Sequence, residues 1–379
     1  MKHFTFRSVK IICISCILVS AQSQAFAQSV TPKTSPAKDT AKPEGKTSAT
    51  ASTTASTTAS TIVNPVEKKK RQVFVLPLDG MVGIGLRHDE MEQVEKIADS
   101  FGPGQVIILR INSNGGLVIE GDWIGASLTR IKAKHRLVAW IEKAISGGAF
   151  TGLFCDEMYF MPEAALGSIT MLSGATRQEI SEVREDWKAR VAEACAAGDR
   201  DPLIGPAMVH SEMELSYEKV GDKVTFYPDA KHTYVLSRKG ENLDFSAQSA
   251  EHSGFSDGTA ATEKDLFLEL GVDDPTKFEV NPAGKQIAEK WQKTISSCKQ
   301  EVPLLLQKRD IEGRSQGGVP FLQARIRNTQ KIVDWFKKCP PEMKYDLQIG
   351  EEAIEQLKDE IVQMRKQIKE MQAAGQPGA

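Results

Sequence analysis

Hydrophobic positions from residue 73 onward follow two alternating patterns, short continuous apolar runs and longer runs with helical spacing. The continuous runs are rich in β-branched and aromatic residues and lie at 73–78, 106–109, 137–141 and 158–161. Such runs, ended by Gly, Asp or Asn, are typical of buried strands. Helical spacing fills the intervals at 91–101 and about 117–132. Apolar strands that alternate with helices predict an α/β fold on a largely parallel sheet with both faces covered.

The C-terminal third has helical spacing throughout, beginning at about residue 283. Near its end, apolar residues recur at alternating steps of three and four, at Ile354, Leu357, Ile361, Met364, Ile368 and Met371. Isoleucine at a and leucine or methionine at d favour a parallel dimeric coiled coil. The alternative is an amphipathic helix that packs on its own chain. We expect a helical extension over 281–346, an amphipathic or coiled-coil helix over 347–373, and a homo-oligomer.

The N-terminus has the pattern of an export signal. Basic residues at 2, 7 and 10 precede an apolar stretch at 11–21, and Ala25-Phe26-Ala27 supplies small residues for cleavage. The stretch is too short to span a bilayer, so we predict a signal peptide over 1–27 and an exported protein, periplasmic or secreted. A retained membrane anchor is the alternative. Residues 28–67 are rich in Ser, Thr, Ala and Pro, which predicts a disordered linker.

Charge and composition exclude several other classes of protein. The chain is 40% hydrophobic and 26% charged, close to a globular average. Lys plus Arg number 48 against 50 for Asp plus Glu, so the chain lacks the basic excess of a nucleic-acid binder. Basic residues 68–71 fit the solvated edge of a strand or, alternatively, a peripheral contact with a membrane surface. No metal-ligand spacing and no phosphate-binding loop occurs, so we expect no metal and no cofactor.

The chain beyond residue 27 retains four cysteines, at 155, 195, 298 and 339. Export would permit disulfide bonds. Cys298 and Cys339 form the expected pair because both flank helical segments of the same region.

Glycine pairs follow two successive predicted strands, at 115–116 and 147–148, and Ser146 comes directly before the second pair. The carboxyl ends of parallel strands are where open α/β sheets bind ligands. Glycines let backbone N–H groups approach a substrate, and a serine at a helix start could attack a carbonyl carbon. This pattern indicates an acyl-transfer site. The alternative is two ordinary strand-to-helix turns in which Ser146 acts only as an N-cap.

Several segments occur in the order found in a known family. They are VFVLPLDGMVGIGL from residue 73, VIILRINSNGG from 106, AISGGAFTGLFCDEMYFMPEAALGSI from 144, and SGFSDGTAAT from 253. Together they resemble the NfeD-type and signal-peptide-peptidase-A-type serine proteases of the Clp protease/crotonase superfamily, with Asn114 in a place usually held by proline. The resemblance implies a repeated β-β-α spiral fold over residues 68–280 and a serine endopeptidase that acts on proteins or peptides. NfeD members usually continue into membrane helices, whereas the sequence after the signal has no apolar stretch of that length, so we expect a soluble product.

The resemblance also implies roles for individual residues. Ser146 takes the place of the nucleophile, Gly147 lies beside it as an oxyanion donor, and Gly115 and Gly116 occupy the other donor site. The family commonly uses a Ser-Lys dyad, and Lys188 lies 42 residues after Ser146.

The sequence leaves two alternatives for the general base. Counting back from the turn at 198–201 puts Glu182, rather than Lys188, in the register of the family's lysine. On one continuous helix these two residues would face well apart. Either Lys188 is the base, or the base is lost and the chain is an inactive family member that serves as a binding or assembly module. A Ser-His-Asp triad has less support, because the first histidine after Ser146 is His210.

Overall fold

The computed structural model describes residues 70–173, 176, 178–315 and 317–375 of the 379-residue chain. The predicted signal peptide (1–27) and linker (28–67) lie outside the described residues, so both stay predictions.

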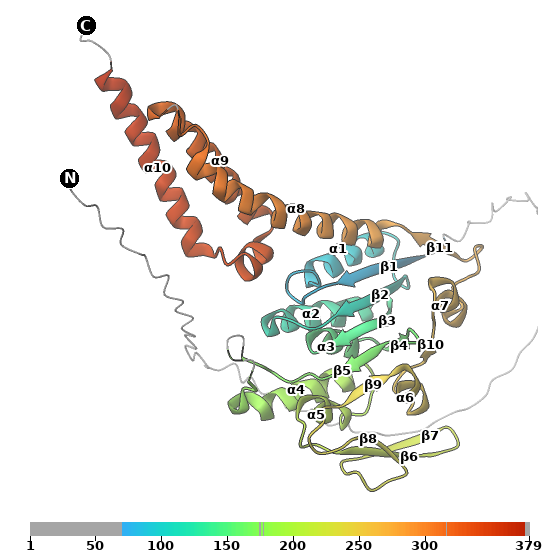
Figure 1. The fold of residues 1–379 in the computed structure, drawn as a ribbon. Helices are drawn as coiled ribbons and strands as arrows, with labels where there is room; N and C mark the ends of the chain where they lie inside the picture. The colour runs from blue at the N-terminus through green and yellow to red at the C-terminus, as the bar shows by residue number, and fades with distance from the viewer. Residues whose placement is uncertain (1–69, 174–175, 177, 316, 376–379) are drawn as a thin grey trace, which may run out of the picture. The chain divides into compact units, whose positions relative to one another are not determined.

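A parallel sheet forms the centre of the α/β part of the chain (Figure 1). Its strands are β1 (Arg71–Asp79), β2 (Val106–Ser113), β3 (Arg136–Ile145), β4 (Glu157–Phe160), β5 (Ala165–Gly167), β9 (Asp244–Ser246), β10 (Gly258–Thr259) and β11 (Phe278–Asn281). The order is β10-β4-β3-β2-β1-β11, all parallel, and the short β5 pairs with the end of β3 and antiparallel with β9. The predicted α/β class with a largely parallel sheet is confirmed.

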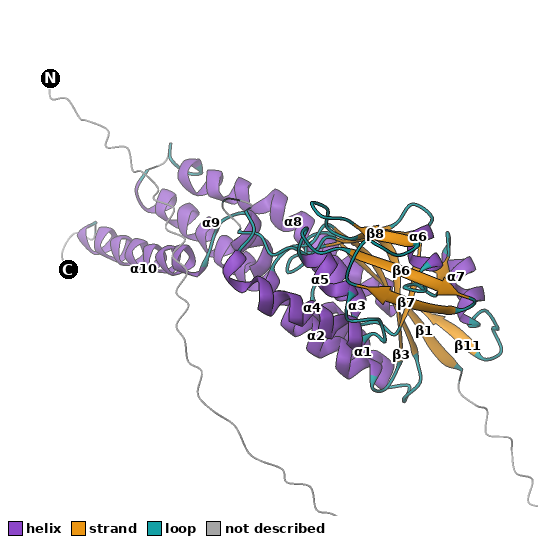
Figure 2. Cartoon of the chain, turned by 90° about the horizontal axis from the view of Figure 1, so that it is seen from below, coloured by secondary structure: helices purple, strands orange, loops and turns teal. Residues whose placement is uncertain are grey.

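Both faces of the sheet are covered, as the continuous apolar runs predict. Along β1, Phe74 and Leu76 point into one hydrophobic core and Val73 and Val75 into another, because successive side chains of a strand face opposite sides. The helices of this part are α1 (His88–Asp99), α2 (Val118–Lys132), α3 (Gly147–Leu153), α4 (Arg184–Ala197), α5 (Ile204–Val209), α6 (Ala247–His252) and α7 (Glu263–Leu270). Figure 2 shows α1 to α4 on one side of the strands and α7 on the other.

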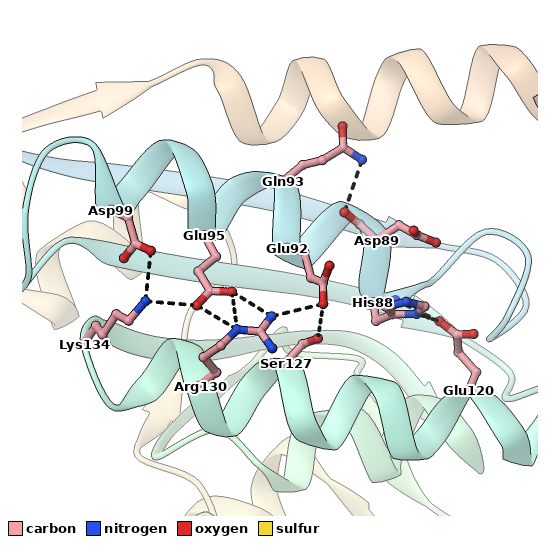
Figure 3. A network of polar contacts seen from close by, with 10 residues as sticks. All are labelled: His88, Asp89, Glu92, Gln93, Glu95, Asp99, Glu120, Ser127, Arg130 and Lys134. Carbon is pink, nitrogen blue, oxygen red and sulfur yellow. Dashed lines mark hydrogen bonds and ion pairs between the residues drawn. The ribbon is translucent and has the colours of Figure 1, made fainter.

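Polar contacts join α1 to α2 on the side that faces away from the sheet. Arg130 Nε lies 2.8 Å from Glu95 Oε2, and its Nη2 lies 3.1 Å from Glu92 Oε1 (Figure 3). At the other end of the helix pair, His88 Nδ1 lies 2.7 Å from Glu120 Oε1 in the first turn of α2. The His88–Glu120 contact holds the start of α2, which begins one residue after the first glycine pair.

A second, antiparallel sheet was not anticipated from the sequence. It contains β6 (Leu215–Val220), β7 (Lys223–Tyr227) and β8 (Tyr234–Ser237) in the order β7-β6-β8. Its strands mix polar and apolar residues and bury few of them, so their apolar signal is weak.

The C-terminal extension is helical, as predicted. It comprises α8 (Ala283–Ile311), α9 (Gly318–Lys338), a π-helical turn η2 (Glu342–Asp346) and α10 (Glu351–Ala374), and it has its own hydrophobic core. Trp291 Nε1 of α8 donates to the carbonyl of Ile84 at 2.7 Å, and the Gln292 amide donates to the carbonyl of Asp79 at 2.8 Å. The extension is therefore bonded to the loop that follows β1. The expected divisions at 280 and 346 stay predictions.

The apolar stripe of α10 is used inside the chain. Ile354 and Leu357 belong to the same core as Ile332 and Val333 of α9, and Ile361 and Met364 are also buried. The alternative stated above, a helix packed on its own chain, therefore describes α10 as far as Met364, whereas Ile368 is half-exposed and Met371 is exposed. The parallel coiled coil and the homo-oligomer stay predictions.

The expected disulfide is not formed in the structure. Cys298 and Cys339 are both buried and both free thiols.

Candidate active site at the carboxyl end of β3

Ser146 forms the turn between β3 and α3 and has an unusual backbone conformation. Its φ is 55° and its ψ is −121°, values that glycine adopts freely and that strain other residues by about 1–3 kcal/mol. Two hydrogen bonds hold it there: its N–H donates to Gly167 O at 2.9 Å, and its carbonyl accepts from Phe150 N–H at 3.0 Å. A sharp strand-to-helix turn presents the nucleophilic serine at the top of the sheet in α/β-hydrolases.

The first glycine pair lies directly beside this serine. A Cβ added to Gly115 would lie 2.5 Å from Ser146 Cβ and 2.9 Å from its Oγ. A Cβ added to Gly116 would lie 2.3 Å from the carbonyl oxygen of Val82. Both positions therefore admit only glycine, and the structure brings Ser146, Gly115 and Gly116 together, as expected for adjacent strands of a parallel sheet.

The hydrogen bonds of the glycines distinguish their roles. Gly115 N–H donates to Ser113 Oγ at 3.1 Å, and its carbonyl accepts from Val82 N–H at 2.9 Å. Within the part of the chain that the structure describes, the N–H groups of Gly116 and Gly147 have no protein acceptor. These two N–H groups are available to a ligand. Gly115 has its N–H occupied, and its lack of a side chain leaves room for Ser146.

A cavity of about 730 Å³ opens at this turn, a size that suits a peptide side chain or a small ligand. Its wall includes Ser146 and Gly147 at the catalytic-type turn, with Gly116 of the first glycine pair. Most of the remaining wall is apolar, from Met81, Val82, Leu117, Val118, Phe150, Met171, Leu172 and Trp187. Tyr345 of η2 also lines it, so the helical extension contributes to the cavity.

Lys188, the expected base, does not line this cavity. Its neighbour Trp187 does, with an indole that stacks on Phe150 at 5.3 Å between ring centroids and donates to the carbonyl of Ile169 at 2.6 Å. The Lys188 ammonium lies instead 2.8 Å from the carboxylate of Glu185, which is 79% exposed.

Glu182, the residue in the register of the family's lysine, is exposed and does not share a helix with Lys188. It lies in a 3₁₀ turn, η1 (Ser181–Val183), and α4 begins only at Arg184. The assumption of one continuous helix is therefore wrong, because the 3₁₀ turn interrupts it. Among the described residues of the cavity wall there is no Lys, His, Asp or Glu.

One carboxylate near the turn was missed by the sequence analysis. Asp244 of β9 accepts a hydrogen bond from Ser168 Oγ at 2.8 Å, and Ser168 lines the cavity. Partial desolvation raises the pKa of the Asp244 carboxyl, and the hydrogen bond from Ser168 opposes this effect. Ser168 directly follows Gly167, whose carbonyl accepts the N–H of Ser146, so the Ser168–Asp244 hydrogen bond lies close to the Ser146 turn. The only sequence signal for it is the stretch from Leu243 to Ala247.

Comparison with known families adds to this geometry. A family model described as the NfeD1b N-terminal domain matches residues 72–280, more than half of the chain. The chain belongs to the NfeD1b family. The membrane protein NfeD1b of Bacillus subtilis (strain 168) is 27% identical over 239 residues, which are 63% of this chain and 49% of that protein. The chain thus spans about half the length of the curated relative it matches. The expected resemblance to NfeD-type proteins is confirmed.

Solved structures that resemble this NfeD1b-family chain include a stomatin-specific protease and a ClpP protein. A lysine-to-alanine mutant of a membrane-bound stomatin-specific protease, in complex with a substrate peptide, is 13% identical with a TM-score of 0.43 over 59% of this chain and 99% of that chain. ClpP1 from Listeria monocytogenes is 19% identical with a TM-score of 0.33 over 51% of this chain and 94% of that chain. Residue roles in the NfeD1b-family chain therefore rest on its own geometry.

Membrane topology was the remaining expectation for this NfeD1b-family chain. In residues 70–375, apart from the positions left undescribed, no helix is both long and apolar enough to cross a bilayer. The curated relative is named a membrane protein.

Proposed function

We propose that this NfeD1b-family chain is an exported serine endopeptidase in which Ser146 attacks the peptide carbonyl. The observation that carries the proposal is the strained backbone of Ser146 in the wall of a cavity, beside two N–H groups that have no acceptor among the described residues. Glycine would occupy the same turn without strain, so a serine at this position lowers the stability of the fold. Strained residues of this kind concentrate at active sites.

The geometry supports acyl transfer through a covalent intermediate. Ser146 Oγ attacks the carbonyl carbon, and the oxyanion that forms accepts hydrogen bonds from the N–H groups of Gly116 and Gly147. The tetrahedral intermediate collapses, the amine leaves with a proton, and water then hydrolyses the acyl-enzyme. The apolar wall formed by Leu117, Phe150 and Trp187 would hold an apolar side chain of the substrate.

Lys188 is the base in this proposal, and it must change partners to act. Its present partner, Glu185, is largely exposed, and ion pairs at a solvated surface are worth only about 0–1 kcal/mol. Leaving Glu185 therefore costs little. Turning toward Trp187 and the apolar wall would remove water from the amine, and apolar surroundings favour the neutral form that accepts a proton.

A second candidate function is peptide binding without hydrolysis. The observation that favours it is the composition of the cavity wall, whose described residues include no Lys, His, Asp or Glu. Such a chain would keep the glycine N–H groups and the apolar wall for holding a peptide carbonyl and side chain.

One experiment separates the two candidates. A fluorophosphonate probe and a fluorogenic peptide library are applied to the wild type and to Ser146→Ala, Lys188→Ala and Glu182→Ala. The endopeptidase predicts labelling and cleavage that disappear in Ser146→Ala, fall at least 100-fold in Lys188→Ala and survive in Glu182→Ala. A wild type that binds peptides but is neither labelled at Ser146 nor active would replace the endopeptidase by the binding module.

Export is part of the proposal and has its own test. Cleavage after Ala27 would leave Gln28 as the first residue. N-terminal sequencing of the chain recovered from the periplasm or the medium is expected to begin at Gln28. Recovery from the cytosol with Met1 still present would contradict export.

A further inference from the structure

The helical extension holds a second cluster of reactive side chains, none of which lines the Ser146 cavity. Cys298 lies in α8, Cys339 directly follows α9, and Glu342 begins η2. All three are 0% exposed, and the two thiols are free. The thiols are hydrogen-bonded to each other, so the two sulfurs are neighbours in one core. We propose that Cys298 and Cys339 form a redox-active dithiol–disulfide pair that cross-links α8 to the junction of α9 and η2.

The surroundings of the two sulfurs indicate which thiol reacts first. The hydrogen bond from Cys298, together with the backbone N–H of Glu342, lowers the pKa of the Cys339 thiol. Cys339 is thus the residue that more readily becomes a thiolate, which is the reactive form of cysteine. Cys298 then acts second, as the thiol that resolves the intermediate.

The other two described cysteines provide a contrast within the chain. Cys155 and Cys195 are buried in the core of the α/β part, and burial raises the pKa of each to about 12. Neither has a second thiol as a partner among the described residues. Burial without a neighbouring thiol indicates a structural cysteine, whereas the contact between the two sulfurs is what makes Cys298 and Cys339 a pair.

The chemistry is thiol–disulfide exchange with a disulfide oxidant, such as glutathione disulfide or an oxidised protein disulfide. The Cys339 thiolate attacks one sulfur of the oxidant, forms a mixed disulfide and releases one oxidant thiol. Cys298 loses its proton and attacks the Cys339 sulfur, which forms the internal bond and releases the second thiol. The pair gives up two electrons and two protons, and the oxidant disulfide becomes two thiols. Because both side chains are fully buried, the exchange takes place while the chain folds or opens locally.

The cross-link would tie the whole of α9 into a closed loop. The loop encloses residues 299–338, and closing it removes conformational freedom from the unfolded chain. It would also anchor the start of η2. Since Tyr345 of η2 lines the Ser146 cavity, the bond would restrain one wall of that cavity.

The test is a mass measurement on the full chain and does not depend on peptidase activity. The protein is equilibrated during refolding in buffers of graded glutathione to glutathione disulfide ratio, quenched in acid, alkylated and digested with trypsin without reduction. Tryptic cleavage places Cys298 in peptide 294–299 and Cys339 in peptide 339–344. We expect a linked pair of these peptides under oxidising conditions, and a Tm for the oxidised chain roughly 5–10 °C above that of the reduced chain.

Variants sharpen the result. Cys298→Ser is expected to lose both the linked peptide and the Tm difference, whereas Cys195→Ala, a matched buried cysteine, is expected to keep both. Alkylation of both peptides at every glutathione ratio in the wild type would overturn the proposal. So would a linked peptide that joins either cysteine to Cys155 or Cys195. Because the mass measurement is made on the wild type, failure of a variant to fold leaves the test intact.

Discussion

Replacement of Ser146 by glycine is expected to abolish activity and yet stabilise the fold relative to Ser146→Ala. With φ at 55° and ψ at −121°, any residue with a Cβ is strained at this turn. Alanine removes the hydroxyl and keeps the Cβ, whereas glycine removes both. The pair of variants therefore separates the loss of the nucleophile from the relief of backbone strain.

The magnitude follows from two opposing effects. Relief of strain at this conformation contributes about 1–3 kcal/mol to the glycine variant. The greater freedom of glycine in the unfolded chain takes back about 0.4–1 kcal/mol. We expect Ser146→Gly to be more stable than Ser146→Ala by about 1 kcal/mol, and both to be inactive.

The assay is denaturant unfolding of both variants, with a matched pair at Ser100. Ser100 is exposed at the end of α1 with φ of −66° and ψ of −19°, an ordinary helical conformation. Both replacements there lose the same hydrogen bond from Ser100 Oγ to the carbonyl of Ile97. At Ser100, glycine is expected to be less stable than alanine by about 0.5–1 kcal/mol, the opposite sign.

Equal signs at the two positions would refute the reasoning. If Ser146→Gly is less stable than Ser146→Ala by as much as the Ser100 pair differs, the turn at Ser146 holds no strain. The conformation that supports the nucleophile assignment would then be absent in solution.

Three further outcomes are expected. Gly116→Ala, whose Cβ would lie 2.3 Å from a backbone oxygen, is expected to lose activity at least tenfold and to unfold at lower denaturant than Gly102→Ala, a glycine with positive φ and open space around it. Burial raises the pKa of Glu342 from 4.5 to about 7, so the carboxyl loses its proton at lower pH in the unfolded chain than in the folded chain, and the stability of the wild type falls as pH rises through that interval. The Tm of Glu342→Gln, which cannot ionise, should therefore rise relative to that of the wild type between pH 5 and pH 8. A Tm difference that stays constant with pH would contradict this. Leu357→Ala should lower the free energy of unfolding by about 2–4 kcal/mol, and Val362→Ala, at a side chain 60% exposed, by less than about 0.5 kcal/mol. Neither variant should change the sedimentation of the protein; a change in association state would indicate that α10 also contacts a second chain.

Much of the fold could be predicted because its strands are apolar on both faces. A continuous apolar run such as 106–109 is typical of a strand buried on both faces, and it forms the first half of β2. The three-stranded sheet of β6, β7 and β8 could not be predicted in this way, since its residues are mostly half-exposed. The heptad spacing also predicted α10 as an amphipathic helix, but spacing alone does not identify the surface that covers its apolar stripe.

The sequence by itself determined which residues could meet at the carboxyl ends of β2 and β3, because parallel strands place their ends at one edge of a sheet. Ser146 and the two glycine pairs follow from that rule. Only the tertiary structure decided how they meet: the backbone strain at Ser146, the hydrogen bond that occupies Gly115 N–H, and the pairing of Lys188 with Glu185 outside the cavity wall. The turn at Ser146 depends on its hydrogen bond to Gly167 of another strand, and the other two depend on side-chain conformations, none of which a pattern of residue types specifies.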